Sequence, residues 1–177
     1  MPVATQVSLE EYLHTIYEPD CEYLDGELVE RNMGETYHGS LQGLITSWLI
    51  QRRKQFGIQV ASETRVQITP RRFRVPDIVV TVGKLKGCIL REPPFLCIEI
   101  LSPEDRASRI QVKIDEYLAF GVHYVWLIDP EERRAWSFTS EGRREATDVL
   151  STTNPDIQLP LGDLFAELEE TIDLSEE

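Results

Sequence analysis

Two acids stand in apolar surroundings where a β-strand rarely carries a charge. Asp77 follows Pro76 at the start of the β-branched run 78–82, and Glu99 lies inside the almost entirely apolar run 95–101. A carboxylate in such a strand is costly to bury unless an ion pair or a metal ion compensates it. If the two strands are neighbours, both carboxylates meet at one edge of a sheet, and we interpret them as one shared site.

The ligands at this edge suit a hard divalent cation, Mg²⁺ or Mn²⁺. Asp77, Glu99 and a main-chain carbonyl, for instance that of Ile100, supply the oxygen ligands that Mg²⁺ prefers. A metal ion bound there polarises a phosphoryl oxygen and lowers the pKa of an attacking water. Such chemistry also needs a cation for the charge that develops at phosphorus. Lys113 is the candidate, because it lies on the next predicted helix beside the apolar residue Ile114.

The elements that must position these groups are visible as periods in the sequence. An apolar stripe at helical spacing predicts a helix over residues 35–56. Upstream, Ser8 and Glu11 form a capping box for a short helix, and Asp25-Gly26 marks a hairpin over residues 22–30. Strand-like runs follow the long helix, at residues 58–61, 64–69, 78–82 and 95–101.

The middle of the chain contains a β-α-β unit that carries Glu99 and Lys113. A helix-start signal at Ser102-Pro103 follows the buried strand 95–101, the helix runs to Phe120, and another buried strand covers 122–128. The connection between two such parallel strands is right-handed. Together with a hairpin strand at 134–138, these elements predict an α/β fold: a central mixed β-sheet flanked by helices, with an N-terminal helix and hairpin.

The length and charge of the chain bound its architecture and its function. With 177 residues, we expect a single domain over residues 1–177, with its core at about 22–138. We interpret residues from about 150 to 177 as an acidic extension with a short helical stretch near 163–168. The net charge of −13 argues against a general nucleic-acid coating protein, but it allows an enzyme with a local basic groove.

Cysteine usage and hydropathy favour a cytoplasmic protein without a membrane partner. Cys21, Cys88 and Cys97 are odd in number and widely spaced, so we expect reduced thiols and no disulfide framework or thiolate zinc site. No run is apolar enough to span a bilayer, and the N-terminus lacks the basic segment of a secretory signal.

The order and spacing of several short motifs resemble those of the PD-(D/E)XK nuclease superfamily and, within it, the bacterial Uma-type group of endonuclease candidates. The similarity covers about residues 8–138, and its N-terminal part includes His38. The motifs that carry the resemblance are Tyr23-Leu24-Asp25-Gly26-Glu27-Leu28-Val29, Arg74-Val75-Pro76-Asp77, Cys97-Ile98-Glu99-Ile100-Leu101-Ser102-Pro103, Lys113 with Glu116-Tyr117 and Gly121-Val122, and Tyr124-Val125-Trp126-Leu127-Ile128-Asp129-Pro130.

The resemblance implies a restriction-endonuclease-like core and a metal-dependent endonuclease that acts on DNA. Asp77 and Glu99 would bind the metal and Lys113 would be the catalytic cation. The superfamily pattern has Lys two residues after the acid, where this chain has Leu101. In the Uma-type group the lysine lies on the helix, which fits Lys113. Glu27 is a candidate third carboxylate, because a helix or hairpin acid takes that part in related nucleases.

Further residues are candidates for the site, each with a simpler alternative. His38 falls on the helical face of Leu41, Ile45 and Leu49 and is predicted to point inward, as a site residue or as a core histidine. Five arginines could form a local phosphate track, or could simply pair with the many acids of the chain: Arg71, Arg72, Arg74, Arg106 and Arg109.

Three functions stay open at this point. The first is the metal-dependent DNA endonuclease, for which a homodimer is plausible because nucleases that cut both strands often work in pairs. The second is a catalytically inactive nuclease-fold protein that acts as a regulatory or protein-binding module, suggested by the negative charge and by Leu101 in place of Lys. The third is a metal-dependent hydrolase of another phosphate substrate.

Overall fold

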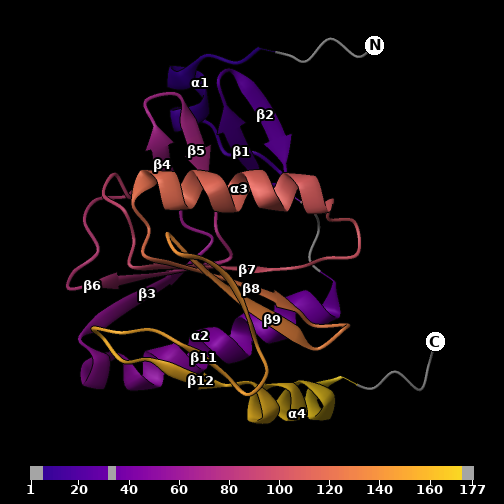
Figure 1. Ribbon diagram of the computed structural model, residues 1–177. Helices are drawn as coiled ribbons and strands as arrows, with labels where there is room; N and C mark the ends of the chain where they lie inside the picture. Colours follow the sequence, from indigo (N-terminus) through magenta and orange to yellow (C-terminus); the bar gives the residue numbers. More distant parts are fainter. Residues whose placement is uncertain (1–5, 32–34, 173–177) are drawn as a thin grey trace.

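The computed structural model describes residues 6–31 and 35–172, which form stacked layers (Figure 1). The first helix, α1 (Leu9–His14), begins where the capping box predicts it, because the Ser8 hydroxyl accepts a hydrogen bond of 3.1 Å from the backbone N–H of Glu11. Beside α1 lies a four-stranded sheet with the order β2-β1-β5-β4. Its strands are β1 (Cys21–Leu24), β2 (Glu27–Glu30), β4 (Val66–Thr69) and β5 (Arg72–Arg74).

The predicted hairpin at Asp25-Gly26 is confirmed, and it joins β1 to β2. Both turn residues have a positive φ, 55° at Asp25 and 109° at Gly26, which is the backbone that a tight two-residue hairpin turn requires. Residues opposite each other in an antiparallel pair share a face of the sheet. Glu22 therefore lies on the same face as Val29, and Leu24 on the same face as Glu27.

The central sheet is mixed, as predicted. Its six strands have the order β10-β9-β8-β7-β6-β3, and β7 and β8 are the one parallel pair among them. Helix α3 (Ala107–Phe120) connects these two strands, so the β-α-β unit is confirmed. The strands are β3 (Ile58–Ser62), β6 (Ile78–Val82), β7 (Leu96–Ile100), β8 (Tyr124–Asp129), β9 (Arg134–Thr139) and β10 (Gly142–Ala146).

The register of β6 against β7 positions the two acids of interest. Ile78 pairs with Ile98, and Val79 pairs with Cys97. Continuing this antiparallel register by one residue brings Asp77 opposite Glu99, on the same face of the sheet. The two strands are neighbours, as the interpretation of a shared site requires.

Helices cover both faces of the central sheet, and α3 separates this sheet from the smaller one (Figure 1). On one face α3 lies between the two sheets, and its buried residues Ile114 and Tyr117 pack with residues of β6, β7 and β8. On the other face lies α2 (Thr36–Phe56), which ends at Gly57 with a positive φ of 67°, as predicted. The layering brings α3 into contact with both sheets.

Helix α3 begins later than its sequence signal predicts. Ser102-Pro103 does not start the helix, and the prediction is wrong by about one turn. Instead, the Asp105 carboxylate accepts a hydrogen bond of 2.8 Å from the Ser102 N–H, and this closes a turn. The Asp105 N–H also donates to the Ser102 carbonyl at 2.9 Å, so residues 102–105 form a turn ahead of the helix.

The chain after residue 146 is not an acidic appendage but part of the main core, which corrects the predicted boundary. A hairpin of β11 (Val149–Ser151) and β12 (Gln158–Pro160) leads into α4 (Leu161–Thr171), which packs against α2. The acids of this segment face solvent. Its apolar residues are buried in one cluster with residues of α2 and the central sheet: Leu150, Ile157, Leu159, Leu161, Leu164, Phe165 and Leu168. Residues 173–177 of the predicted extension lie outside the described residues.

We expect Leu159→Ala to destabilise the protein by about 2–5 kcal/mol, because it leaves a cavity where a fully buried side chain was. Urea unfolding followed by circular dichroism measures this change. Val149→Ala, at an exposed position of the same hairpin, is the matched control and should change the free energy of unfolding little. Equal, small effects of both substitutions would contradict the assignment of this segment to the core.

Candidate active site

Glu99 is a buried carboxylate with two specific partners on α3. Glu99 lies near the end of β7, an inner strand of the central sheet, and the residue is only 3% exposed. Oε2 lies 2.8 Å from the Lys113 ammonium, and Oε1 accepts a hydrogen bond of 2.7 Å from the Tyr117 hydroxyl. Lys113 and Tyr117 are four residues apart and therefore share a helix face. The predicted approach of Lys113 to the acid is confirmed.

Asp77 is equally buried and is held by groups from three different segments. Oδ1 accepts a hydrogen bond of 2.7 Å from Arg31, which follows β2. Oδ2 accepts one of 2.7 Å from the backbone N–H of Ile100 and lies 3.2 Å from His38 Nε2. His38 thus points from α2 to the site, as predicted. Since the N–H and C=O of one strand residue point to the same side, the Ile100 carbonyl also faces the side of Asp77.

A third carboxylate, from Glu22 on β1, holds Lys113 from the opposite side. Its Oε1 lies 3.1 Å from Lys113 Nζ and also accepts the Val75 N–H at 3.0 Å. Its Oε2 accepts a hydrogen bond of 2.6 Å from Arg74. Arg74 in turn donates to Glu116 at 2.6 Å, so α3 is clamped to the smaller sheet by a chain of ion pairs.

The burial of these charges shifts their pKa values in different directions. Burial, reinforced by the nearby Asp77 carboxylate, raises the pKa of Glu99 to about 7 in spite of Lys113. Burial would also raise the pKa of Asp77, but the hydrogen bond from His38 and the charge of Lys113 lower it below the usual value. Burial opposes the charged form of Lys113, yet Glu22 and Glu99 raise its pKa above the usual value. Two ionised groups therefore flank one acid that titrates near neutrality.

These side chains line one cavity of about 870 Å³ between α3, the β1–β2 hairpin and the edge of the central sheet. The cavity gathers most of the predicted site residues: Glu27, His38, Arg74, Asp77, Glu99, Ile100, Arg109 and Lys113. Glu27 is exposed, and its strand position puts it on the face of the hairpin that carries Glu22 and Leu24. Its expected role as a third metal ligand stays a prediction, whereas Glu22 contacts Lys113 directly.

The five arginines of the predicted phosphate track fall into two groups. Arg74 is buried between Glu22 and Glu116, and Arg72 pairs with Asp25 and Glu116. These two arginines therefore pair with acids of the chain, which was the alternative to a phosphate track. Arg71 donates to the Asp25 carbonyl. Arg106 and Arg109 are exposed, and neither forms an ion pair within residues 6–31 and 35–172. A contact of these two with phosphate stays a prediction.

Sequence reasoning missed three partners of the site. Glu22 carries the same signal as Glu99, an acid between apolar residues of a strand, here Cys21 and Tyr23. Tyr117 is named only within a family motif, although its spacing of four from Lys113 indicates a shared face. Arg31 has no such local signal, because its contact with Asp77 joins segments that are distant in the sequence.

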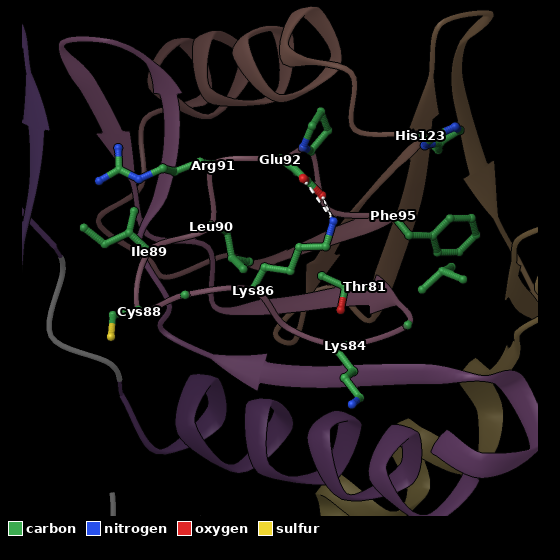
Figure 2. Close-up of a pocket in the computed structure, with 14 residues that line it drawn as sticks. Thr81, Lys84, Lys86, Cys88, Ile89, Leu90, Arg91, Glu92, Phe95 and His123 are labelled. Atoms are coloured by element: carbon green, nitrogen blue, oxygen red, sulfur yellow. Dashed lines mark hydrogen bonds and ion pairs between the residues drawn. The ribbon is translucent and has the colours of Figure 1, made fainter.

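A second cavity, of about 770 Å³, lies at the opposite end of β6 and β7 and contains none of the predicted site residues. Figure 2 shows the loop residues that line it, with the Lys86 ammonium directed at the Glu92 carboxylate, 2.7 Å away. Both side chains are largely exposed, whereas Asp77 and Glu99 are buried. The cavity next to Asp77 and Glu99 is therefore the better candidate for chemistry.

The donor set beside α3 fits a hard divalent cation in kind. Asp77 and Glu99 supply two carboxylates on one face, and Glu99 has a pKa raised by burial that a bound cation would lower. Among the described residues, no group of three or more His, Cys, Asp or Glu side chains is arranged to hold a metal ion. A metal would therefore rely on two carboxylates, a main-chain carbonyl and water, which is how Mg²⁺ is often bound.

A mixed sheet with one β-α-β crossover, two acids at its edge and a helix-borne lysine defines a restriction-endonuclease-like α/β protein. The sequence profile of the Uma2 family, described as "Putative restriction endonuclease", matches residues 9–174. The chain belongs to the Uma2 family. The family resemblance stated from the motifs is thereby confirmed.

A solved structure agrees with this assignment. The chain is similar to a crystal structure described as a putative nuclease belonging to DUF820 from Anabaena variabilis ATCC 29413. The TM-score is 0.80 at 25% identity, over 92% of this chain and 99% of that one. A cryo-EM structure of a DrdV–DNA complex matches with a TM-score of 0.43 at 14% identity, over 80% of this chain and 12% of that one, a level that does not establish a common fold. No curated protein matches the chain at a significant level.

The raised pKa of Glu99 predicts that its ionisation destabilises the metal-free protein. Between the usual value of 4.5 and about 7 the folded state binds more protons than the unfolded state, so this group's contribution to stability falls as pH rises. Relative to wild type, Glu99→Gln should gain roughly 2–3 kcal/mol between about pH 5 and pH 8. Urea unfolding of both proteins in EDTA measures the difference. Parallel pH profiles would contradict the shift.

Proposed function

We propose that this protein is a metal-dependent endonuclease that hydrolyses phosphodiester bonds of DNA. The observation that carries the proposal is the meeting of Asp77 and Glu99 on neighbouring strands in one cavity, with the Lys113 ammonium 2.8 Å from Glu99. Further support comes from the Uma2 family, which is described as "Putative restriction endonuclease". The acids come from the sheet and the cation from the helix, so the fold itself aligns the three groups.

In this proposal Asp77, Glu99 and the Ile100 carbonyl hold Mg²⁺ or Mn²⁺. When bound, the metal would supply Lewis-acid polarisation of the phosphoryl oxygen and a water of lowered pKa. Ile100 has a second role: its N–H donates a hydrogen bond of 2.7 Å to Asp77 Oδ2 and so orients that carboxylate. His38, 3.2 Å from the same oxygen, orients it from the side of α2.

Lys113 is the cation that stabilises the attacking water and the charge growing on the phosphate. Glu22 and Glu99 keep it charged and hold its ammonium in the cavity. Tyr117 donates to Glu99 and so limits the orientations of that carboxylate. We propose that the exposed Arg106 and Arg109, on the same helix, contact DNA phosphates outside the cavity.

We also expect a cytoplasmic protein that forms a homodimer. Cys21, Cys88 and Cys97 are free thiols, which agrees with a reducing compartment such as the cytoplasm. Within the described residues there is no helix with the length and hydropathy to cross a membrane. A homodimer would allow both strands of a duplex to be cut, and light scattering of the purified protein tests for it.

Asp77→Ala and Glu99→Ala are each expected to lower Mg²⁺- or Mn²⁺-dependent DNA cleavage by at least about a hundredfold, because each removes a metal ligand. Lys113→Ala should lower the rate by roughly a hundredfold, as expected for loss of a single stabilising donor. Conversion of supercoiled plasmid and of labelled oligonucleotides measures the rates.

Glu141→Ala removes an exposed acid of the β9–β10 hairpin and is the matched control, with activity expected at the wild-type level. Circular dichroism must show that each variant is folded. Unchanged cleavage by folded Asp77→Ala and Glu99→Ala proteins would reject the proposal.

A catalytically inactive nuclease-fold protein is the second candidate, and one observation favours it. Asp77 already contacts Arg31 and His38, and Glu99 contacts Lys113, so each candidate metal ligand has a partner without a metal. Isothermal titration with Mn²⁺ separates the candidates. The enzyme should bind Mn²⁺, and Glu99→Ala should abolish binding, whereas absence of binding to the wild-type protein would favour a regulatory or protein-binding module.

A further inference from the structure

The walls of the active-site cavity differ in charge, which bears on the form of DNA that it admits. One wall is α3, where Arg109, Val112 and Lys113 all line the cavity. These residues are three and four positions apart and so form one stripe along the helix. Arg106, three residues before Arg109, extends the stripe outside the cavity. A strand of phosphates could follow these cations from the surface to Lys113.

The opposite wall is the β1–β2 hairpin, and it repels phosphate. Leu24, Glu27 and Val29 line the cavity on the hairpin face that carries Glu22. Glu27 is exposed at the mouth, while Leu24 and Val29 are half-buried apolar side chains. This wall offers contact to the apolar faces of bases, but no cation for a second sugar–phosphate backbone.

The overall charge of the cavity sharpens this asymmetry. The described residues that line it include six acids and four Lys or Arg residues, and Arg31, Arg74 and Lys113 are ion-paired with carboxylates. Arg109 is the lining cation that forms no ion pair within the described part of the chain. Because nucleic-acid affinity grows with the number of neutralised phosphates, one wall of cations suits one backbone better than two.

The burial of Asp77 and Glu99 also favours a single strand over a duplex. Asp77 and Glu99 are 4% and 3% exposed, so a phosphate must enter the cavity to reach them. A duplex is stiff over about 150 base pairs, and it carries a second backbone that would meet the acidic hairpin. A single strand is flexible, and its bases are free to turn toward an apolar wall.

We propose that the substrate is single-stranded DNA, its phosphates lying along Arg106, Arg109 and Lys113 and its bases against Leu24 and Val29. The inference rests on the proposed function for its catalytic part, but the binding preference stands on the charges and the burial alone. Single-stranded ends, flaps and unpaired segments of duplexes are the DNA forms that meet these requirements.

Fluorescence anisotropy tests the preference without hydrolysis. A labelled mixed-sequence oligonucleotide, alone or annealed to its complement, is titrated with the protein in Ca²⁺. The single strand is expected to bind at least about tenfold more tightly than the duplex. Arg109→Ala should weaken single-strand binding roughly five- to tenfold and reduce the slope of log Kd against log salt by about 0.7.

Arg144→Ala is the matched control, because it removes an exposed arginine of β10 outside this cavity and should leave both affinities unchanged. Duplex binding as tight as single-strand binding, or equal effects of Arg109→Ala and Arg144→Ala, would overturn the inference.

Cleavage of the same two DNA forms in Mn²⁺ separates this inference from the proposed function. Cleavage of the single strand in preference to the duplex supports both. Cleavage of the duplex alone refutes the single-strand preference and leaves the endonuclease intact. If the single strand binds more tightly but neither form is cut, the endonuclease proposal fails and the binding preference stands.

Discussion

The ammonium of Lys113, held between the carboxylates of Glu22 and Glu99, is the interaction on which the rest of the structure depends. The two acids belong to different sheets, and the lysine belongs to the helix packed between them. Removing Lys113 would leave the buried Glu99 carboxylate without its cationic partner, which is costly in a protein core. The same three groups therefore fasten the smaller sheet to α3, set the position of α3 over the central sheet, and bring a cation to the candidate catalytic acids.

This arrangement departs from the usual rule that cores are apolar, and it does so at one place. Asp77, with its lowered pKa, and Glu99, with its raised pKa, lie side by side although one environment favours ionisation and the other opposes it. Such opposite pKa shifts of neighbouring groups occur mainly at functional sites of proteins. A divalent cation would relieve it, because the cation compensates the charge of Glu99 that burial disfavours. The buried charge of Glu99 thus accounts both for the energetic cost of the metal-free site and for its proposed capacity to bind a metal ion.

The strongly acidic surface and a nucleic-acid substrate are compatible because electrostatic recognition is local. Outside the clamp of ion pairs, the exposed cations of α3 lie in one stripe that leads to Lys113. A net charge of −13 suppresses nonspecific association with duplex DNA, and a short cationic path can still admit one backbone. In the proposed binding mode, selectivity would come from the charge of each wall and not from the total charge.

The sequence by itself determined the β-α-β unit, the long helix and the two acids, because a carboxylate in an apolar strand and a lysine beside an apolar helix stripe are local signals. His38 followed from the same helical periodicity. Only the tertiary structure decided which charges meet: that Glu22 and not Glu27 contacts Lys113, that Arg74 is buried between two acids, and that Arg31 reaches Asp77. It also decided that residues 149–171 complete the core beneath α2. These facts are pairings between distant segments, and neither periodicity nor composition encodes which partner a side chain will find once the layers are packed.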